Sequence, residues 1–457
     1  MPEVVECIEE LLQKYNGSDS LFLSCELMKI LLDMKVGDPA SYAPMADTAA
    51  ATAEGKREGL QARAYLEVLA RWYARGKDIA KEQSVWLRYA ETYVQEAEDA
   101  LSRPTPSYGV AAHFLQEAIE ALRNRVPGSG ERQQELHHLL LEYQQKAVAE
   151  LKSTSVSTDI TELVDHAEQA VRDRSLLDAL LALACLVTLP SKQHLREQAE
   201  QHANDSIWRL FPRVMLNDQG KVVARQPGLY GSRKEEEASL QAEVLHSAIL
   251  HYSLSAQGTI LPAIGQIIRE HVVTIGDFLH LVQDNPFVPP GREMIVARGL
   301  HAGMMGDFLV STHLLVPQVE HAIRTLAQRV GVITSSLTSV GIQDELSLND
   351  LLEKPELAQI FNEDTLFTLQ DLLVEHHGAN LRNLVAHGLL DHDSFYSGAA
   401  VYLWWLVLWL CCIPVMNGIY QELSARKQTA DASGPPHPSS DLPADTSPEE
   451  KPAQETL

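Results

Sequence analysis

The chain has few cysteines, and their spacing suggests neither a disulfide framework nor a structural metal. Its 457 residues include five, Cys7, Cys25, Cys185, Cys411 and Cys412, with no C-x-x-C pair among them. Paired spacings of that kind are what disulfide scaffolds and zinc clusters show. No cleavable apolar segment follows the acidic first ten residues either. We therefore expect a cytoplasmic protein in a reducing compartment, without a cofactor or a bound metal.

Basic residues are also scarce, and this scarcity restricts how the protein could bind a nucleic acid. Lys and Arg number 37 against 62 Asp and Glu, which gives a formal net charge of −25. Sequence-independent binding to phosphate backbones depends on clustered Lys and Arg. A broad polyanion binder is excluded on this ground, and any RNA would have to be held by a local pocket.

Alternating runs of β-branched residues are almost absent, so we expect an all-α protein. Residues 1–216 carry apolar side chains at three- and four-residue spacing, which predicts helix after helix. The clearest predicted helices are Leu60–Arg75, Ile79–Leu101, Tyr108–Arg125 and Glu131–Leu151. Short breaks between them favour repeat-like α-hairpins that could bind a protein partner, although no fixed period supports a named repeat and an irregular bundle stays an alternative.

Composition divides the rest of the chain into three parts. Residues 217–240 hold several glycines and lack apolar periodicity, which indicates a linker. The helical pattern then resumes over 241–427 as a second domain, interrupted between Asp284 and Gly291. Residues 428–457 contain six prolines, six acids and no aromatic residue, so this tail is predicted to be disordered, because it cannot bury enough apolar area to offset its ordering entropy.

The stretch from Arg382 to Gly388 places a cation, an amide and an imidazole within about one and a half helical turns. Asn383 and His387 are four residues apart and share a helix face, and Arg382 precedes His387 by five residues. These groups could cleave a phosphodiester. The spacing alone is weak, since Arg132 and His137 repeat it elsewhere in the chain.

A second polar group lies in the predicted helix between Asp307 and Val330. His313, Glu320 and Arg324 are separated by seven and four residues, so they form one stripe on an otherwise apolar helix. One interpretation is an ordinary Glu320–Arg324 pair beside a core histidine. The other is that the stripe faces the Arg382–His387 segment and orients its side chains.

Several ordered blocks around both features resemble a family of domains of unknown function whose signature is Arg-Asn-x-x-x-His-Gly. The family is grouped with the HEPN (higher eukaryotes and prokaryotes nucleotide-binding) superfamily, and one of its branches is associated with RNA degradation at the endoplasmic reticulum membrane. The resemblance covers roughly residues 285–410. The blocks are Asn285-Pro286-Phe287, Gly291-Arg292-Glu293, Gly306 to Leu309, His313 to Glu320, Ile323-Arg324, Gly341 to Glu345 and Leu381 to Gly388.

The resemblance implies a helical HEPN-like bundle that forms a homodimer and cleaves RNA without a metal. Arg382 would neutralise the scissile phosphate, His387 would act as general base or general acid, and Asn383 would orient the substrate or the histidine. His313, Glu320 and Arg324 would support them. Many HEPN domains are catalytically silent, so a non-catalytic dimerisation or protein-interaction module is the alternative. Residues 285–427 count fifteen acids and eight bases, a balance of −7, which favours selective cleavage.

The apolar run from Ala399 to Met416 is eighteen residues without a charge, which is the lower limit for crossing a bilayer. Two interpretations follow. The run is either a core helix, apolar on every side because it packs within its own domain and against a partner subunit, or an anchor that makes the protein membrane-associated. The core helix is the favoured interpretation. The run directly follows the Arg382–Gly388 stretch, and the cleft that the resemblance implies there needs a packed dimer.

Overall fold

The computed structural model describes residues 2–15, 17, 22–151, 157–205, 213–216, 220–226 and 233–432. It is an all-α protein, as predicted, with two short β-hairpins as its strands in these ranges. Contacts divide the chain into two compact units, one formed by residues 1–158 and 206–239 and the other by residues 159–205 and 240–457. The predicted tail begins inside the last helix, which runs to Ala432, and residues 433–457 lie outside the described residues.

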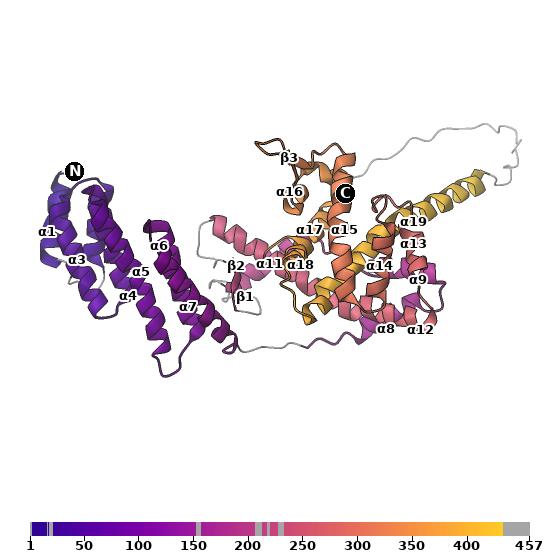
Figure 1. The fold of residues 1–457 in the computed structure, drawn as a ribbon, viewed down its shortest axis with the longest axis horizontal. Helices are drawn as coiled ribbons and strands as arrows, with labels where there is room; N and C mark the ends of the chain where they lie inside the picture. The colour runs from indigo at the N-terminus through magenta and orange to yellow at the C-terminus, as the bar shows by residue number, and fades with distance from the viewer. Residues whose placement is uncertain are drawn as a thin grey trace, which may run out of the picture. The chain divides into compact units, whose positions relative to one another are not determined.

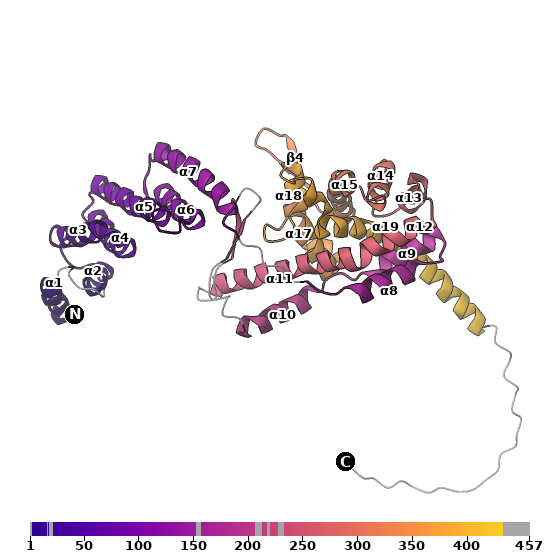
Figure 2. The same cartoon turned by 90° about the horizontal axis from the view of Figure 1, so that it is seen from below.

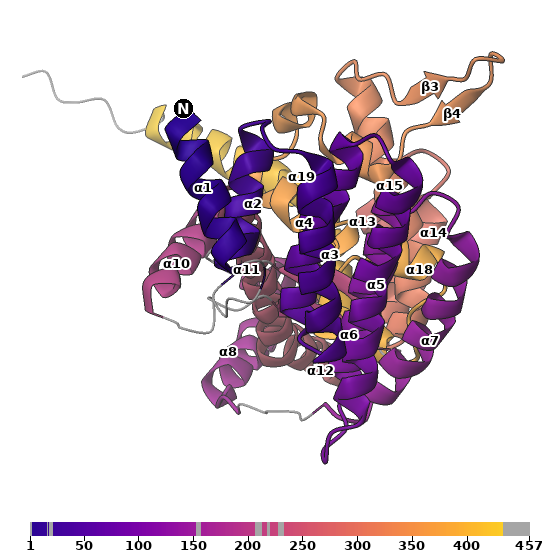
Figure 3. The ribbon, with the colours of Figure 1, turned by 90° about the vertical axis from the view of Figure 1, so that its left-hand side faces the viewer.

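The first unit is a row of helices in which each helix from α3 to α6 packs against the next one along the chain, while α2 contacts α1 and α4 (Figures 1, 2 and 3). This arrangement matches the predicted α-hairpins. A short antiparallel β-hairpin, whose second strand lies in the predicted linker, also belongs to this unit. The elements are α1 Pro2–Tyr15, α2 Leu23–Asp33, α3 Pro39–Gly55, α4 Gly59–Arg75, α5 Ile79–Leu101, α6 Tyr108–Arg125, α7 Gly130–Val148, β1 Arg213–Leu216 and β2 Val222–Gln226.

Local sequence explains the ends of these helices. After α4 the chain turns at Lys77, whose φ of 59° stops the helix, and the carboxylate of Asp78 accepts from the backbone N–H of Lys81 to cap α5. Ser107 caps α6 in the same manner. The predicted boundaries of α5 and α6 are therefore those of the structure, since both the apolar spacing and the caps act within a few residues.

The second unit is a helical bundle built around its last helix. Its elements are α8 Thr161–Val171, α9 Leu176–Leu186, α10 Lys192–Asp205, α11 Arg233–Ser255, η2 Ala256–Ile260, α12 Leu261–Glu270, α13 Ile275–Val282, α14 Glu293–Met304, α15 Phe308–Arg329, β3 Ser335–Leu337, β4 Gln343–Glu345, α16 Leu348–Leu352, η3 Pro355–Gln359, α17 Glu363–Leu373, α18 Leu381–Ala386, η4 Asp393–Tyr396 and α19 Gly398–Ala432. The first residues of α11, up to Ser239, belong to the first unit.

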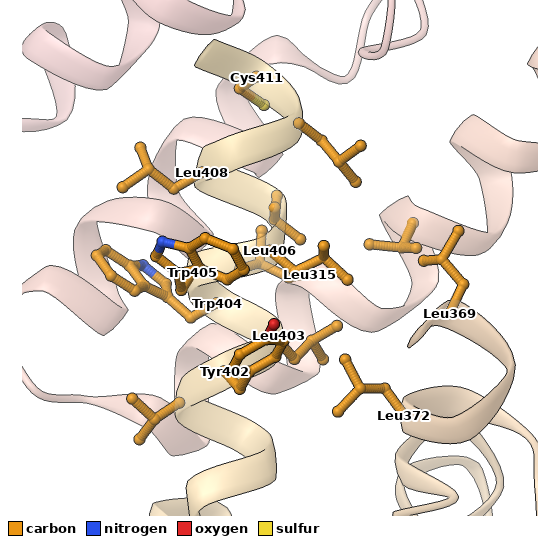
Figure 4. Close-up of a cluster of buried hydrophobic side chains, with 14 of the residues drawn as sticks. Leu315, Leu369, Leu372, Tyr402, Leu403, Trp404, Trp405, Leu406, Leu408 and Cys411 are labelled. Atoms are coloured by element: carbon orange, nitrogen blue, oxygen red, sulfur yellow. The ribbon is translucent and has the colours of Figure 1, made fainter. Parts of the chain in front are cut away.

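The apolar run is the buried centre of this bundle. Side chains of α19 from Ala400 to Leu408 are buried, and Figure 4 shows Tyr402, Trp404 and Trp405 among leucines of neighbouring helices. Within the described residues, Gly398–Gly418 is the one helix long and apolar enough to cross a bilayer, yet 72% of its apolar window is buried inside the structure. This burial favours a core helix that packs within its own domain, and packing against a partner subunit stays a prediction.

The boundary between the units differs from the prediction, which placed residues 1–216 in one region. Helices α8, α9 and α10 belong to the second unit because their partners lie there. The indole N–H of Trp405 donates to the carbonyl of Leu183 in α9 at 3.1 Å, and the carboxylate of Asp364 in α17 accepts from the backbone N–H of Lys192 at the start of α10. The predicted linker, 217–240, likewise contains β2 and the start of α11.

The segment that interrupts the helical pattern after α13 is held in place by hydrogen bonds of one buried side chain. The buried Asn285 donates from Nδ2 to the carbonyls of Leu281 and Cys411, and its Oδ1 accepts from the backbone N–H of Phe287. The Asn-Pro-Phe block of the sequence therefore fastens the segment between α13 and α14 to α19. Every polar atom of this buried amide is used, as burial requires.

Candidate functional site on α15 and α18

The segment from Arg382 to Gly388 forms most of one short helix and the turn that ends it. Helix α18 stops at Ala386, and Gly388 adopts φ +62°, a left-handed conformation that favours glycine. The backbone N–H of Gly388 donates to the carbonyl of Val385, and that of Leu389 to the carbonyl of Leu384. This pair of bonds is a Schellman ending. His387 is the last residue before the turn and its side chain is exposed.

Arg382 is held from two sides. Its Nε donates to Oε2 of Glu320 in α15 at 2.9 Å, and its Nη1 donates to Oδ1 of Asn383 at 3.1 Å. Asn383 is fixed in turn, because its Nδ2 donates to Oδ1 of Asn380 at 2.7 Å. Within the described part of the chain, Nη2 of Arg382 makes no hydrogen bond. The guanidinium is thus oriented by two contacts, and one N–H edge is left for a ligand.

Glu320 joins the two arginines of the site. Its Oε1 accepts from Nη2 of Arg324 at 3.1 Å, and the same nitrogen also donates to the carbonyl of Leu346. Nε of Arg324 lies 3.0 Å from Oε2 of Glu345 in β4. Burial acts to raise the pKa of Glu320, but the hydrogen bonds from Arg382 and Arg324 outweigh it and hold the pKa below its usual value. Glu320 therefore stays ionised, and the four charged groups sum to zero.

His313 lies at the other end of the same stripe, with a different environment. Its ring packs on Phe395 of η4 with ring centroids 4.8 Å apart. Its Nδ1 lies 2.9 Å from the carbonyl oxygen of Leu309. A carbonyl can only accept, so Nδ1 carries the hydrogen. The imidazole is therefore fixed by stacking and by one hydrogen bond, and it remains exposed.

The structure brings four of the six predicted site residues into one connected network, made of Arg382, Asn383, Glu320 and Arg324. The predicted contact between the stripe of α15 and the motif helix exists through Glu320. His313 shares the stripe but contacts Phe395 rather than the network. The side chain of His387 makes no hydrogen bond, ion pair or ring contact with any residue in the described ranges.

The sequence did not single out three residues that complete the site. Glu345 belongs to one of the blocks that carry the family resemblance, which marked it as a candidate. No sequence pattern indicated its ion pair with Arg324. Phe395 and Asn380 carried no signal, because their roles depend on which side chains lie beside them after folding. Asn380 adopts φ 51°, a conformation that asparagine tolerates better than most residues.

A buried carboxyl supports the turn that leads into α18. Asp371, in α17, is fully buried, and its backbone carbonyl accepts from the N–H of Ala379. The hydroxyl of Tyr252 in α11 faces its carboxyl without reaching hydrogen-bond geometry. Burial raises the pKa of Asp371 to about 7, against a smaller opposing effect of the Tyr252 hydroxyl. A Cβ on Gly378 would lie 2.3 Å from Oδ1 of Asp371, so the turn requires a glycine there.

The second copy of the Arg-His spacing contains an arginine whose three nitrogens all donate to carboxylates. Arg132 in α7 donates from Nε and Nη2 to Glu91 and from Nη1 to Glu135. All three of its nitrogens are engaged by carboxylates, whereas Arg382 retains a free Nη2. The two copies therefore differ in the one property that phosphate binding requires, a guanidinium edge open to a ligand.

The site combines two groups that suit anion chemistry, the guanidinium of Arg382 and the imidazole of His387. Among the described residues, no group of three or more His, Cys, Asp and Glu side chains lies close enough to hold a metal ion. An oriented guanidinium and an exposed imidazole are the groups that bind a phosphate and transfer a proton. Comparison of the chain with family models, with curated proteins and with solved structures gave no match.

Proposed function

We propose that the protein is a metal-independent endoribonuclease of HEPN type that works as a homodimer in the cytoplasm. One observation carries the proposal. Arg382 is clamped by Glu320 and Asn383 with Nη2 left open, one and a half turns before an exposed His387 at a fixed helix end. The guanidinium would bind the scissile phosphate, and the imidazole would transfer a proton. The RNA would enter a local pocket, since residues 285–427 carry a balance of fifteen acids to eight bases.

The test is cleavage of mixed RNA in excess chelator. Wild type is expected to yield fragments with 2′,3′-cyclic phosphate ends, and both Arg382→Ala and His387→Ala are expected to lose roughly 100-fold or more of the rate. Arg132→Ala is the matched control, because it removes an arginine of the same spacing whose nitrogens are all engaged. The proposal fails if wild type cleaves no RNA, or if the Arg382 and His387 variants cleave as well as wild type.

The rival function is a non-catalytic module that dimerises or binds a partner. It is favoured by the pairing of Arg382 with Glu320 and by exposed apolar side chains in α15, in the turn after α18 and in η4. Val310 is 40% exposed, Leu389 58% and Tyr396 44%. Such side chains are suited to the centre of an interface. The α-hairpins of the first unit would bind the protein partner in this case.

Sedimentation and cleavage together separate the two functions. Leu389→Glu is expected to convert a dimer to a monomer under both proposals, because a buried unpaired charge opposes association. Under the nuclease proposal the monomer also loses cleavage, since the cleft would be shared by two subunits. Wild type that dimerises without cleaving any RNA supports the rival.

A further inference from the structure

His313 has the properties of a proton acceptor. The roles proposed for Arg382 and His387 give it no part in proton transfer. Its Nδ1 hydrogen is committed to the carbonyl of Leu309 at 2.9 Å. In the neutral ring the other nitrogen, Nε2, therefore holds a lone pair and no hydrogen. The ring is exposed, and stacking on Phe395 at 4.8 Å restricts its rotation. A fixed tautomer with an accessible basic nitrogen is what a general base requires.

The chain segment that contains His387 is attached to α15 at both of its ends. Arg382 is tied to Glu320, and thirteen residues later Phe395 is tied to His313. Glu320 and His313 are seven residues apart on α15, a separation of about 10 Å along the helix axis. The segment that contains His387 thus runs along α15 from Glu320 back to His313, and both α18 and η4 contact α15.

Side chains become more exposed along the path from Glu320 to His313. Glu320 and Arg324 are mostly buried, while His313 and His387 are exposed. The ion-paired end of the stripe is closed and the histidine end is open to a substrate. Other titratable groups here are His392 and Asp393 beside Phe395, with Arg382 and Glu320 toward the closed end. His392 differs from His313, since its ring is tilted at 54° to that of Tyr396 and no hydrogen bond within the described residues fixes its tautomer.

We propose that His313 is the general base and His387 the general acid of RNA cleavage, an inference that rests on the proposed function. Nε2 of His313 takes the proton of the 2′-hydroxyl, and the 2′-oxygen forms a bond to phosphorus. The bond from phosphorus to the 5′-oxygen breaks with its electron pair on that oxygen, which takes a proton from His387. The products are a 2′,3′-cyclic phosphate and a free 5′-hydroxyl, and Arg382 binds a non-bridging phosphate oxygen throughout.

The test compares ordinary and activated leaving groups. Cleavage sites are first mapped on mixed RNA with the wild-type full chain, and an oligoribonucleotide around one site is made with either oxygen or sulfur at the 5′-bridging position. A thiolate leaves without a general acid. His387→Ala is therefore expected to regain most of its rate on the sulfur substrate, whereas His313→Ala and His313→Gln stay slowed roughly 100-fold or more on both substrates.

Further readouts distinguish a base from a structural histidine. In the rate–pH profile the His313 variants should lose the acidic limb that wild type shows, and His392→Ala should retain it. Nitrogen NMR of the His313 ring should show hydrogen on Nδ1 and none on Nε2 at high pH. Wild-type cleavage that is unchanged in the His313 variants, or rescue of those variants by sulfur, overturns this inference alone. Absence of any wild-type cleavage overturns the proposed function and this inference with it.

Discussion

Replacement of Glu320 by glutamine tests the electrostatic centre of the site. The carboxylate accepts from Arg382 at 2.9 Å and from Arg324 at 3.1 Å, and its side chain is only 16% exposed. Glutamine keeps the shape but removes the charge, so two guanidinium groups remain close together, and only Arg324 keeps a carboxylate partner, the exposed Glu345, among the described residues. Charge-assisted hydrogen bonds contribute about 1.5–3 kcal/mol each, and desolvation of the partners offsets part of this. We expect a net loss of about 2 kcal/mol at pH 7.

The matched control is Glu345→Gln. Glu345 also pairs with Arg324, but its side chain is 61% exposed, and exposed pairs contribute about 0.2–1 kcal/mol. Urea unfolding of the full chain measures both variants, and hydrogen exchange of residues 308–329 shows whether the loss lies in the second unit. A cost for Glu345→Gln equal to that for Glu320→Gln, or no cost for either, would refute the reasoning.

The same prediction has a pH dependence with a definite sign. The folded-state pKa of Glu320 is lowered by its two arginine partners, so its contribution is complete above the unfolded-state value of about 4.3. The contribution is lost as the pH falls from that value through the lowered folded-state value, because the proton then binds to both states. The stability difference between wild type and Glu320→Gln should therefore hold from pH 7 to pH 5 and shrink below about pH 4.

Three further predictions concern the turn after α18, the buried carboxyl and the apolar helix. Gly388→Ala should cost about 1 kcal/mol in urea unfolding because φ is +62° there, whereas Gly55→Ala, with no atom near its added Cβ, should cost nothing. The pKa of Asp371 is raised to about 7, so the folded state loses stability as the pH rises from about 4 to 7. Asp371→Asn should flatten that dependence and raise the free energy of unfolding at pH 8, measured by urea unfolding, by as much as about 4 kcal/mol. Because α19 is buried in its own unit, the full chain should partition into the aqueous phase of a detergent phase separation, and recovery in the detergent phase would contradict its role as a core helix.

Local features of the sequence predicted parts of the second unit correctly. Helix α15 occupies the predicted interval, with Asp307 as its N-cap, because capping and apolar spacing act over one or two turns. The turn at Gly388 and the shared face of His313, Glu320 and Arg324 follow from the same short-range geometry. RNA cleavage and the homodimer, which the resemblance to HEPN domains implies, stay predictions. The experiments above test them.

Features that depend on contacts between distant residues were not predictable from the sequence. The affiliation of α9 with the second unit depends on Trp405, more than two hundred residues away. The ion pair of Arg324 with Glu345 and the stacking of His313 on Phe395 likewise require the hairpin and η4 to return to α15. No local pattern encodes such pairings.

The sequence by itself determined that the chain is helical, where helices such as α5 and α6 begin and end, and that a cation, an amide and an imidazole lie within one short segment. Those outcomes depend on propensity, periodicity and capping, which act between near neighbours. Only the tertiary structure decided that Arg382 is clamped with one edge open while Arg132 is fully engaged. The identical spacing could not separate them, because the difference lies in which carboxylates the fold brings to each guanidinium.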